Sequence, residues 1–198
     1  MQRIVFDFDV VSPYAYLAFE RLPRALEGLS YQVEYQPLLF AGLLKHWGNV
    51  GPAEIDPKRE WLFRQCDWIA RQDGTVFEKP ARHPFNPLAL LRLLIASVPS
   101  GQHPNRWAVE RVMRHVWARG GADAIEPAAL AALTAEIEPV RDPASDEVKQ
   151  ELRERTEAAI RRGVFGVPTF TLDDGRLFWG QDAIPMLVDA MRDAQARG

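Results

Sequence analysis

Ser12 is the residue whose type and position most clearly suggest chemistry. It follows the alternating apolar run of residues 4–11 and precedes Pro13, so it would stand where a strand ends and a helix begins. Backbone N–H groups and the helix dipole favour an anion at such a point. A hydroxyl there could donate a hydrogen bond to a thiolate, worth about 1.5–3 kcal/mol, and so lower the pKa of that thiol by roughly one to two units.

Two other interpretations of Ser12 stay open. Serine before proline begins many helices simply as an N-cap. The second is a hydrolytic triad, for which the chain offers four histidines: His46, His83, His103 and His115. All four lie in one stretch with helical patterns, which disfavours a triad, although a histidine distant in sequence could still be close in space.

The chain contains 1 cysteine, Cys66. A single cysteine excludes an internal disulfide and a Cys-x-x-Cys pair. Its apolar and aromatic neighbours indicate a helix face, which favours a buried structural thiol over a reactive one.

The Val167-Pro168 pair is the second candidate for ligand binding. Gly166 precedes it and a β-branched and aromatic run, residues 169–171, follows, which predicts a tight entry into an edge strand. Proline often opens a strand without any function. If the Val167–Pro168 peptide is cis, the N–H and C=O of Val167 stay free to pair with a peptide-like ligand.

The elements that must position these residues can be read from periodicity. Alternation predicts strands at 4–11 and 31–38 with a helix from 13 to about 28 between them. Strand signals are absent from 40 to 142, where helices are predicted at 61–72, 88–97, 106–119 and 127–136. A helix at 145–162, a hairpin of strands at 168–172 and 176–179, and a helix at 181–196 complete the chain. This order resembles an α/β thioredoxin-like fold with a large all-helical insertion, as in the DsbA-like group. It implies one domain made of 1–39 plus 143–198 and an inserted helical domain, 40–142.

Composition narrows the classes of partner. The chain has 198 residues, 47% of them hydrophobic, and a formal net charge of −3, so it can bury a core and offers no basic surface to nucleic acid or an anionic membrane. The first nine residues alternate apolar and acidic types, unlike a signal peptide or a membrane span. We expect a cytoplasmic protein without nucleic-acid, membrane or metal partners.

Several short motifs in the same order resemble the 2-hydroxychromene-2-carboxylate isomerases, a family closely related to kappa-class glutathione transferases. They are residues 6–18 (FDFDVVSPYAYLA), 48–52 with Lys58, Phe85-Asn86-Pro87, and 163–170 with 178–182. The similarity covers essentially the whole chain. A thioredoxin-type redox enzyme would carry cysteines where this chain has Ser12 and Ala15, so the resemblance implies that the reacting thiol belongs to bound glutathione.

The resemblance also implies roles for individual residues. Ser12 would be catalytic and lie near the glutathione sulfur, and Val167, with Pro168, would hold the cysteinyl part. Gln181 and Asp182 would hold the γ-glutamyl end, whose ammonium suits a carboxylate. Asn49 and Lys58 would contact the glycyl end, where lysine suits the carboxylate. Two simpler readings stay open: Lys58 as a solvated lysine and Asp182 as a helix cap. Ala183 stands where the family often has arginine, which weakens the expected contact to the γ-glutamyl carboxylate.

The sequence gives fewer signals for the residues that line the substrate pocket. Phe85 and Asn86 are the candidates by family position, although Asn86 could instead cap the helix that follows it. Four tryptophans of the inserted stretch could also contribute, with most expected in the core: Trp47, Trp61, Trp107 and Trp117.

The resemblance implies a glutathione-dependent cis–trans isomerase that interconverts 2-hydroxychromene-2-carboxylate and trans-o-hydroxybenzylidenepyruvate in aromatic hydrocarbon catabolism. The thiolate would add to a conjugated carbon, permit rotation and then be eliminated, so glutathione is a catalyst. A small aromatic substrate and a homodimer are implied likewise. The alternatives are a kappa-like glutathione transferase or peroxidase acting on another electrophile, and a non-catalytic glutathione- or peptide-binding protein. Ser12 and Ala15 argue against a disulfide oxidoreductase, because neither can form a mixed disulfide.

Overall fold

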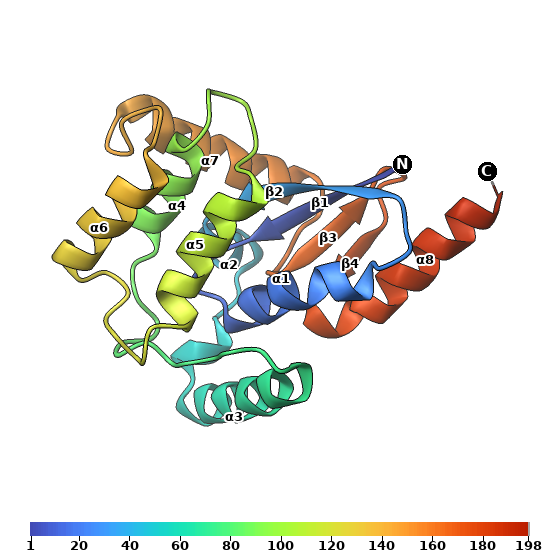
Figure 1. Ribbon diagram of the computed structural model, residues 1–198, viewed down its shortest axis with the longest axis horizontal. Coiled ribbons are helices and arrows are strands. Elements are labelled where there is room, and N and C mark those ends of the chain that lie inside the picture. The colour runs from blue at the N-terminus through green and yellow to red at the C-terminus, as the bar shows by residue number, and fades with distance from the viewer. Residues whose placement is uncertain (198) are drawn as a thin grey trace.

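The computed structural model describes residues 1–197 and has a four-stranded sheet at its centre (Figure 1). Its strands are β1 (Gln2–Phe8), β2 (Tyr31–Pro37), β3 (Thr169–Leu172) and β4 (Leu177–Trp179). The strand order is β2-β1-β3-β4; β2 is parallel to β1, whereas the β1–β3 and β3–β4 pairs are antiparallel. The thioredoxin-like α/β fold is therefore confirmed. Gly198, the last residue of the predicted sheet domain, lies outside the described residues.

The first strand is shorter than predicted. Ile4, Phe6 and Phe8 are fully buried, as the alternation indicates, but the strand ends at Phe8 rather than at residue 11. The chain turns away from the sheet there because one carboxylate oxygen of Asp9 accepts a hydrogen bond from the Val11 N–H at 3.0 Å. The turn of residues 9–11 leads directly to Ser12, at the end of β1 that points towards the inserted helices (Figure 1).

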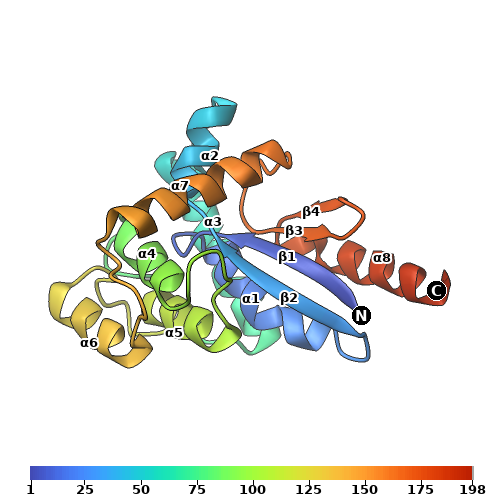
Figure 2. The same ribbon diagram turned by 90° about the horizontal axis from the view of Figure 1, so that it is seen from above.

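Helices cover both faces of the sheet. α1 (Pro13–Ala25) packs against α8 (Ile184–Arg197), and α7 (Asp146–Arg161) lies on the opposite face from α1 (Figure 2). Proline at the first position of α1 needs no hydrogen-bond partner for its nitrogen, so it suits the start of a helix. A short 3₁₀ helix, η2 (Gln181–Ala183), joins β4 to α8.

The inserted stretch is helical, as predicted. It contains α2 (Phe40–Trp47), the 3₁₀ helix η1 (Pro52–Glu54), α3 (Asp56–Asp73), α4 (Leu88–Ala96), α5 (Arg106–Trp117) and α6 (Pro127–Ile137). α5 shows the expected spacing, with Val109, Val112 and Val116 buried along one face. These residues belong to the same apolar core as the buried side chains of β1 and α1, so the core is continuous across the predicted domain boundary. The division into two domains stays a prediction.

Among residues 1–197, no helix combines the length and the apolar character needed to cross a membrane.

Candidate active site

The predicted site residues gather where the end of β1 meets the inserted helices. A cavity of about 720 Å³ opens there. Four of the residues predicted to contact glutathione border it: Ser12, Asn49, Lys58 and Val167. A second cavity of about 240 Å³ adjoins the first, because Tyr14, Val167 and Trp179 border both. The remaining three predicted residues border this smaller cavity: Pro168, Gln181 and Asp182. The fold thus brings all seven positions predicted to contact glutathione around two neighbouring cavities.

Ser12 caps α1 and keeps its proton available. Its Oγ accepts a hydrogen bond from the Ala15 N–H at 3.2 Å, which confirms the N-cap interpretation, and the side chain is largely buried. Because a serine hydroxyl can accept and donate at once, its O–H can still donate to an acceptor in the cavity. The N-cap and the hydrogen-bond donor are therefore compatible uses of one side chain.

Asp9 holds the loop before Ser12 and was not foreseen as a site residue. Its side chain is fully buried and borders the larger cavity. One carboxylate oxygen accepts from Val11 N–H, and the other accepts from Phe40 N–H at 2.9 Å. Burial raises the pKa of Asp9 to about 7, and the two backbone hydrogen bonds oppose that rise. The carboxyl group therefore fastens the Ser12 loop to the start of α2.

His83 is the one histidine that reaches this cavity in the described chain. Its Nε2 lies 2.8 Å from the Val11 carbonyl oxygen. Since a carbonyl only accepts, Nε2 carries the proton, and burial lowers the pKa of the ring below its usual value. Nδ1 is buried and has no hydrogen-bond partner among the described residues. The ring supports the Ser12 loop, and no hydrogen bond within residues 1–197 joins it to Ser12 as a triad requires.

The Val167–Pro168 peptide is cis, as the fold implied. The Pro168 carbonyl accepts from Gly180 N–H at 2.9 Å, which ties the loop to the end of β4. In the described part of the chain, the N–H and C=O of Val167 have no hydrogen-bond partner. Backbone groups of this kind can pair with an extended peptide ligand.

The smaller cavity is lined by hydrogen-bond acceptors. Gln181 is buried, and its Oε1 has no hydrogen-bond partner among residues 1–197. The Asp182 carboxylate packs against Gly180, whose φ is 97° and where a Cβ would overlap an Asp182 oxygen. Gly180 therefore combines a backbone conformation that favours glycine with the space that the carboxylate needs. Unpaired carboxylate and amide oxygens suit a ligand with an ammonium group.

Asn49 and Lys58 lie at the outer rim of the larger cavity. Both are exposed, and the Asn49 side chain accepts from the N–H of the next residue at 2.9 Å. Lys58 is in the first turns of α3 and forms no ion pair within the described chain. A free ammonium at this rim is available to an anionic group of a ligand.

The two pocket candidates differ in position. Phe85 is buried and borders the larger cavity. Asn86 is not among the described residues that border it; its side chain accepts from Leu88 N–H at 3.1 Å, next to the start of α4. This hydrogen bond supports a local structural role for Asn86 at the start of α4.

Apart from Phe85, the aromatic wall of the larger cavity includes residues that the sequence analysis did not assign to it. None of the four tryptophans named from the inserted stretch borders the cavity within the described chain. Trp117 is fully buried and donates to the Val10 carbonyl at 2.9 Å, while Trp61 is exposed. Phe165 and Trp179 border the cavity instead. Both flank the predicted Val167-Pro168 and Gln181-Asp182 motifs, which is the signal that could have identified them.

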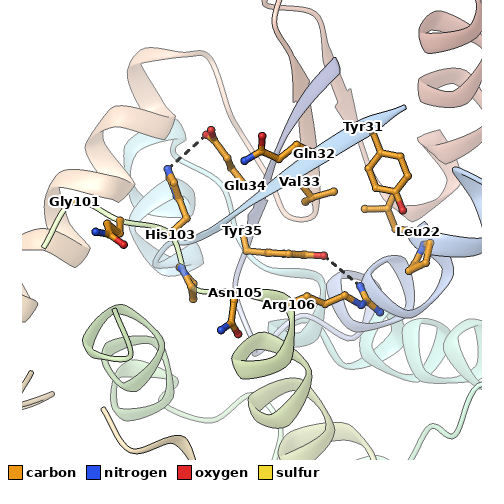
Figure 3. A pocket seen from close by; sticks show the side chains of 13 residues that line it. Leu22, Tyr31, Gln32, Val33, Glu34, Tyr35, Gly101, His103, Asn105 and Arg106 are labelled. Atoms are coloured by element: carbon orange, nitrogen blue, oxygen red, sulfur yellow. Dashed lines mark hydrogen bonds and ion pairs between the residues drawn. The ribbon is translucent and has the colours of Figure 1, made fainter. Parts of the chain in front are cut away.

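A further cavity of about 720 Å³ lies along β2, at the edge of the sheet (Figure 3). Its polar side chains pair with one another: Glu34 with His103 at 3.5 Å, and Arg106 with the Tyr35 hydroxyl at 3.3 Å (Figure 3). No predicted site residue borders it. We therefore place the candidate active site at the end of β1.

Comparisons with known proteins show the family to which the chain belongs. The model of the DSBA-like thioredoxin domain matches residues 3–192. The 2-hydroxychromene-2-carboxylate isomerase of Pseudomonas sp. (strain C18) is 32% identical over 98% of this chain and 92% of that protein. Glutathione s-transferase kappa 2 of Caenorhabditis elegans is 29% identical over 96% of this chain and 92% of that protein.

Solved structures agree as well. A structure of 2-hydroxychromene-2-carboxylate isomerase superposes with a TM-score of 0.84 at 27% identity, covering 98% of this chain and 97% of the other. A probable DsbA oxidoreductase from Streptomyces coelicolor, 17% identical over 100% of this chain and 92% of the other, shares the fold with a TM-score of 0.72. The chain belongs to the DsbA-like thioredoxin family, in the group that contains 2-hydroxychromene-2-carboxylate isomerases and kappa-class glutathione transferases.

Proposed function

We propose that this protein is a glutathione-dependent cis–trans isomerase that interconverts 2-hydroxychromene-2-carboxylate and trans-o-hydroxybenzylidenepyruvate. The observation that carries the proposal is that a hydroxyl donor, a free backbone pair and unpaired acceptors border two neighbouring cavities: Ser12, Val167, and Gln181 with Asp182. Relatives named as isomerases and as glutathione transferases support both the reaction class and the use of glutathione.

The donor and acceptor groups match the three parts of glutathione. The buried, unpaired Oε1 of Gln181 and the Asp182 carboxylate suit the γ-glutamyl ammonium. The unpaired N–H and C=O of Val167 suit the central cysteinyl residue. The Lys58 ammonium and Asn49, at the rim of the larger cavity, suit the glycyl carboxylate.

The γ-glutamyl carboxylate has a weaker match. Ala183 is buried at the position where the family often has arginine, and no lysine or arginine borders the smaller cavity in the described chain. Affinity for glutathione would then depend on the ammonium, cysteinyl and glycyl contacts.

Glutathione supplies, when bound, a thiolate that can add to a conjugated carbon and leave again. The chain's own task is to keep that sulfur ionised and in place. Ser12, whose Oγ caps α1, would donate its O–H to the sulfur, and the N-terminus of α1 would add a favourable field for negative charge. Cys66 is excluded as the nucleophile, because it is fully buried and burial strongly raises the pKa of its thiol.

A kappa-like glutathione transferase acting on another electrophile is the second candidate, favoured by the kappa-class relative from Caenorhabditis elegans. The two reactions differ in the fate of glutathione, because a transferase consumes it and an isomerase returns it. The cytoplasmic location and the homodimer stay predictions from the sequence.

The test follows the ultraviolet absorbance of 2-hydroxychromene-2-carboxylate with purified protein, with and without glutathione, and then titrates the remaining thiol. We expect turnover that requires glutathione and leaves its amount unchanged. Stoichiometric loss of thiol would favour the transferase. Absence of turnover in both conditions would contradict the isomerase proposal.

A further inference from the structure

We infer that Gln65 of α3 donates to the γ-glutamyl carboxylate of glutathione, the group that Ala183 leaves without an arginine; the inference rests on the proposed function for the identity of the ligand. Gln65 borders the smaller cavity, which Asp182 also borders. No lysine or arginine borders that cavity within residues 1–197, so the carboxylate needs another donor. A side-chain amide carries two N–H donors, and a hydrogen bond to a charged group is stronger than one between neutral groups.

The amide of Gln65 has a fixed orientation. The Tyr14 hydroxyl donates to Gln65 Oε1 at 2.6 Å, which joins the first turn of α1 to the middle of α3. Burial raises the pKa of Tyr14 to about 12, so the phenol keeps the proton that it donates. The N–H groups of Gln65 Nε2 have no hydrogen-bond partner among residues 1–197, and this nitrogen is not enclosed by protein atoms. They are therefore available to a ligand in the smaller cavity.

The partners for the two charges of a γ-glutamyl group lie near one another. Burial is the main cause of the raised pKa of Tyr14, and the nearby charge of Asp182 adds to it, while Gln65 is hydrogen-bonded to the same hydroxyl. The ammonium and the carboxylate of a γ-glutamyl group are attached to one carbon atom, so their partners must lie close together. The Asp182 carboxylate attracts the ammonium and repels the ligand's carboxylate, which leaves Gln65 as the donor for the latter.

The position of Gln65 on α3 also matches the length of glutathione. Lys58, assigned to the glycyl carboxylate, precedes Gln65 by seven residues, so the two lie on one face of the helix and roughly 10 Å apart along its axis. Lys58 borders the larger cavity, Gln65 borders the smaller one, and Val167 borders both. The two carboxylates of extended glutathione lie about 10–12 Å apart. One face of α3 can thus hold both ends of glutathione while the Val167 backbone holds its centre.

Calorimetry with a pair of peptides tests this contact. Glutathione is compared with 4-aminobutanoyl-cysteinyl-glycine, which retains the ammonium and the thiol and lacks the γ-glutamyl carboxylate. We expect wild type to prefer glutathione by about tenfold, since hydrogen bonds to charged groups change affinities by at least that order. In Gln65→Leu the preference should fall below about 2-fold, through weaker binding of glutathione alone. A wild-type preference below about 2-fold would overturn the inference.

Further variants separate the donor from its support. Gln65→Glu can still accept from Tyr14 but offers no donor and adds a negative charge, so it should prefer the peptide without the carboxylate. Tyr14→Phe removes the hydroxyl that orients the amide and should lose part of the preference for glutathione. The matched control is Gln72→Leu, because Gln72 is exposed on the same helix and borders neither cavity of the site in the described chain. The same loss in Gln72→Leu, or none in Gln65→Leu, would overturn the contact and assign the carboxylate to donors in residues 179–182.

Turnover distinguishes this inference from the proposed function. Gln65→Leu should raise the KM for glutathione about tenfold and leave kcat within about 2-fold of wild type, because Gln65 borders the smaller cavity and Ser12 the larger one. Glutathione binding with the expected preference and no turnover would support the contact and contradict the proposed isomerase. Turnover with an unchanged preference in Gln65→Leu would support the proposed function and overturn the contact. Absence of glutathione binding by wild type would contradict both.

Discussion

Replacing Ser12 with alanine should slow catalysis much more than it weakens glutathione binding. The Ser12 Oγ accepts from Ala15 N–H, and its O–H is the donor that we assign to the glutathione sulfur. The substitution removes both hydrogen bonds. The groups that we assign to the rest of glutathione, at Val167 and in the smaller cavity, are left in place.

The two losses have different magnitudes and different consequences. Loss of the cap lowers the free energy of unfolding by about 1 kcal/mol. Loss of a charge-assisted hydrogen bond of about 1.5–3 kcal/mol raises the pKa of the bound thiol by roughly one to two units. A thiol returned to a pKa near ~8.5 is only a few per cent ionised at neutral pH. We therefore expect turnover at neutral pH to fall about 8- to 25-fold and to recover as the pH rises.

The assay combines the ultraviolet absorbance of the bound thiolate, titrated with pH, and turnover of the isomerase substrate over the same range. Ser145→Ala is the matched control, because Ser145 caps α7 in the same way, accepting from Val148 N–H at 3.3 Å, and does not border the cavities. Ser12→Thr retains a hydroxyl and should retain most of the activity. The same thiol pKa and pH–rate profile in wild type and Ser12→Ala would refute the assigned role.

Three other substitutions test the supports of the site. Gly180→Ala should weaken glutathione binding by about tenfold in calorimetry, because its Cβ would displace the Asp182 carboxylate and its φ of 97° strains alanine. Burial raises the pKa of Asp9 to about 7 from 3.8, so the folded protein binds a proton that the unfolded chain releases. The free energy of unfolding should therefore fall as the pH rises from about 4 to 7, by at most ~1.4 kcal/mol per pH unit from this group. In urea denaturation, the free energy of unfolding of Asp9→Asn should depend less steeply on pH over this range. Trp117→Phe should lower the free energy of unfolding by about 2–4 kcal/mol in urea denaturation, because it leaves the Val10 carbonyl unpaired and a void in the core; a loss below about 0.5 kcal/mol would contradict the packing argument.

The sheet and most helices could be predicted because their residues alternate or repeat locally. The predictions were wrong where contacts between residues distant in sequence determine where an element begins or ends. The end of β1 was placed too late, since an acidic residue in an alternating run, Asp9, looks like part of the outer face, whereas it is buried and turns the chain. α2 was not located within the helical stretch, because it has 8 residues and only Leu43 is buried, too few for a periodic signal.

The position of the candidate site could be predicted where it depends on the ends of helices and strands, and not where it depends on packing. Ser12 and Val167 stand at a helix start and a strand entry, which local sequence encodes. The aromatic wall could not be located from tryptophan content, since composition does not reveal which rings face a cavity. Trp117 lies in the core, whereas Phe165, in the loop before β3, and Trp179, the last residue of β4, border the cavity.

The inserted helices have a second task besides bordering the cavity. Trp117 donates to the Val10 carbonyl, His83 donates to the Val11 carbonyl, and Asp9 accepts from Val11 N–H and from the start of α2. Each of the three residues between β1 and Ser12, residues 9–11, thus forms a hydrogen bond with the inserted stretch. Because the position of the Ser12 hydroxyl depends on this turn, substitutions in the insertion that touch no ligand should still change the pKa of the bound thiol. The geometry of the candidate site is therefore a property of the packing between the sheet and the insertion, and the serine at the helix start alone does not determine it.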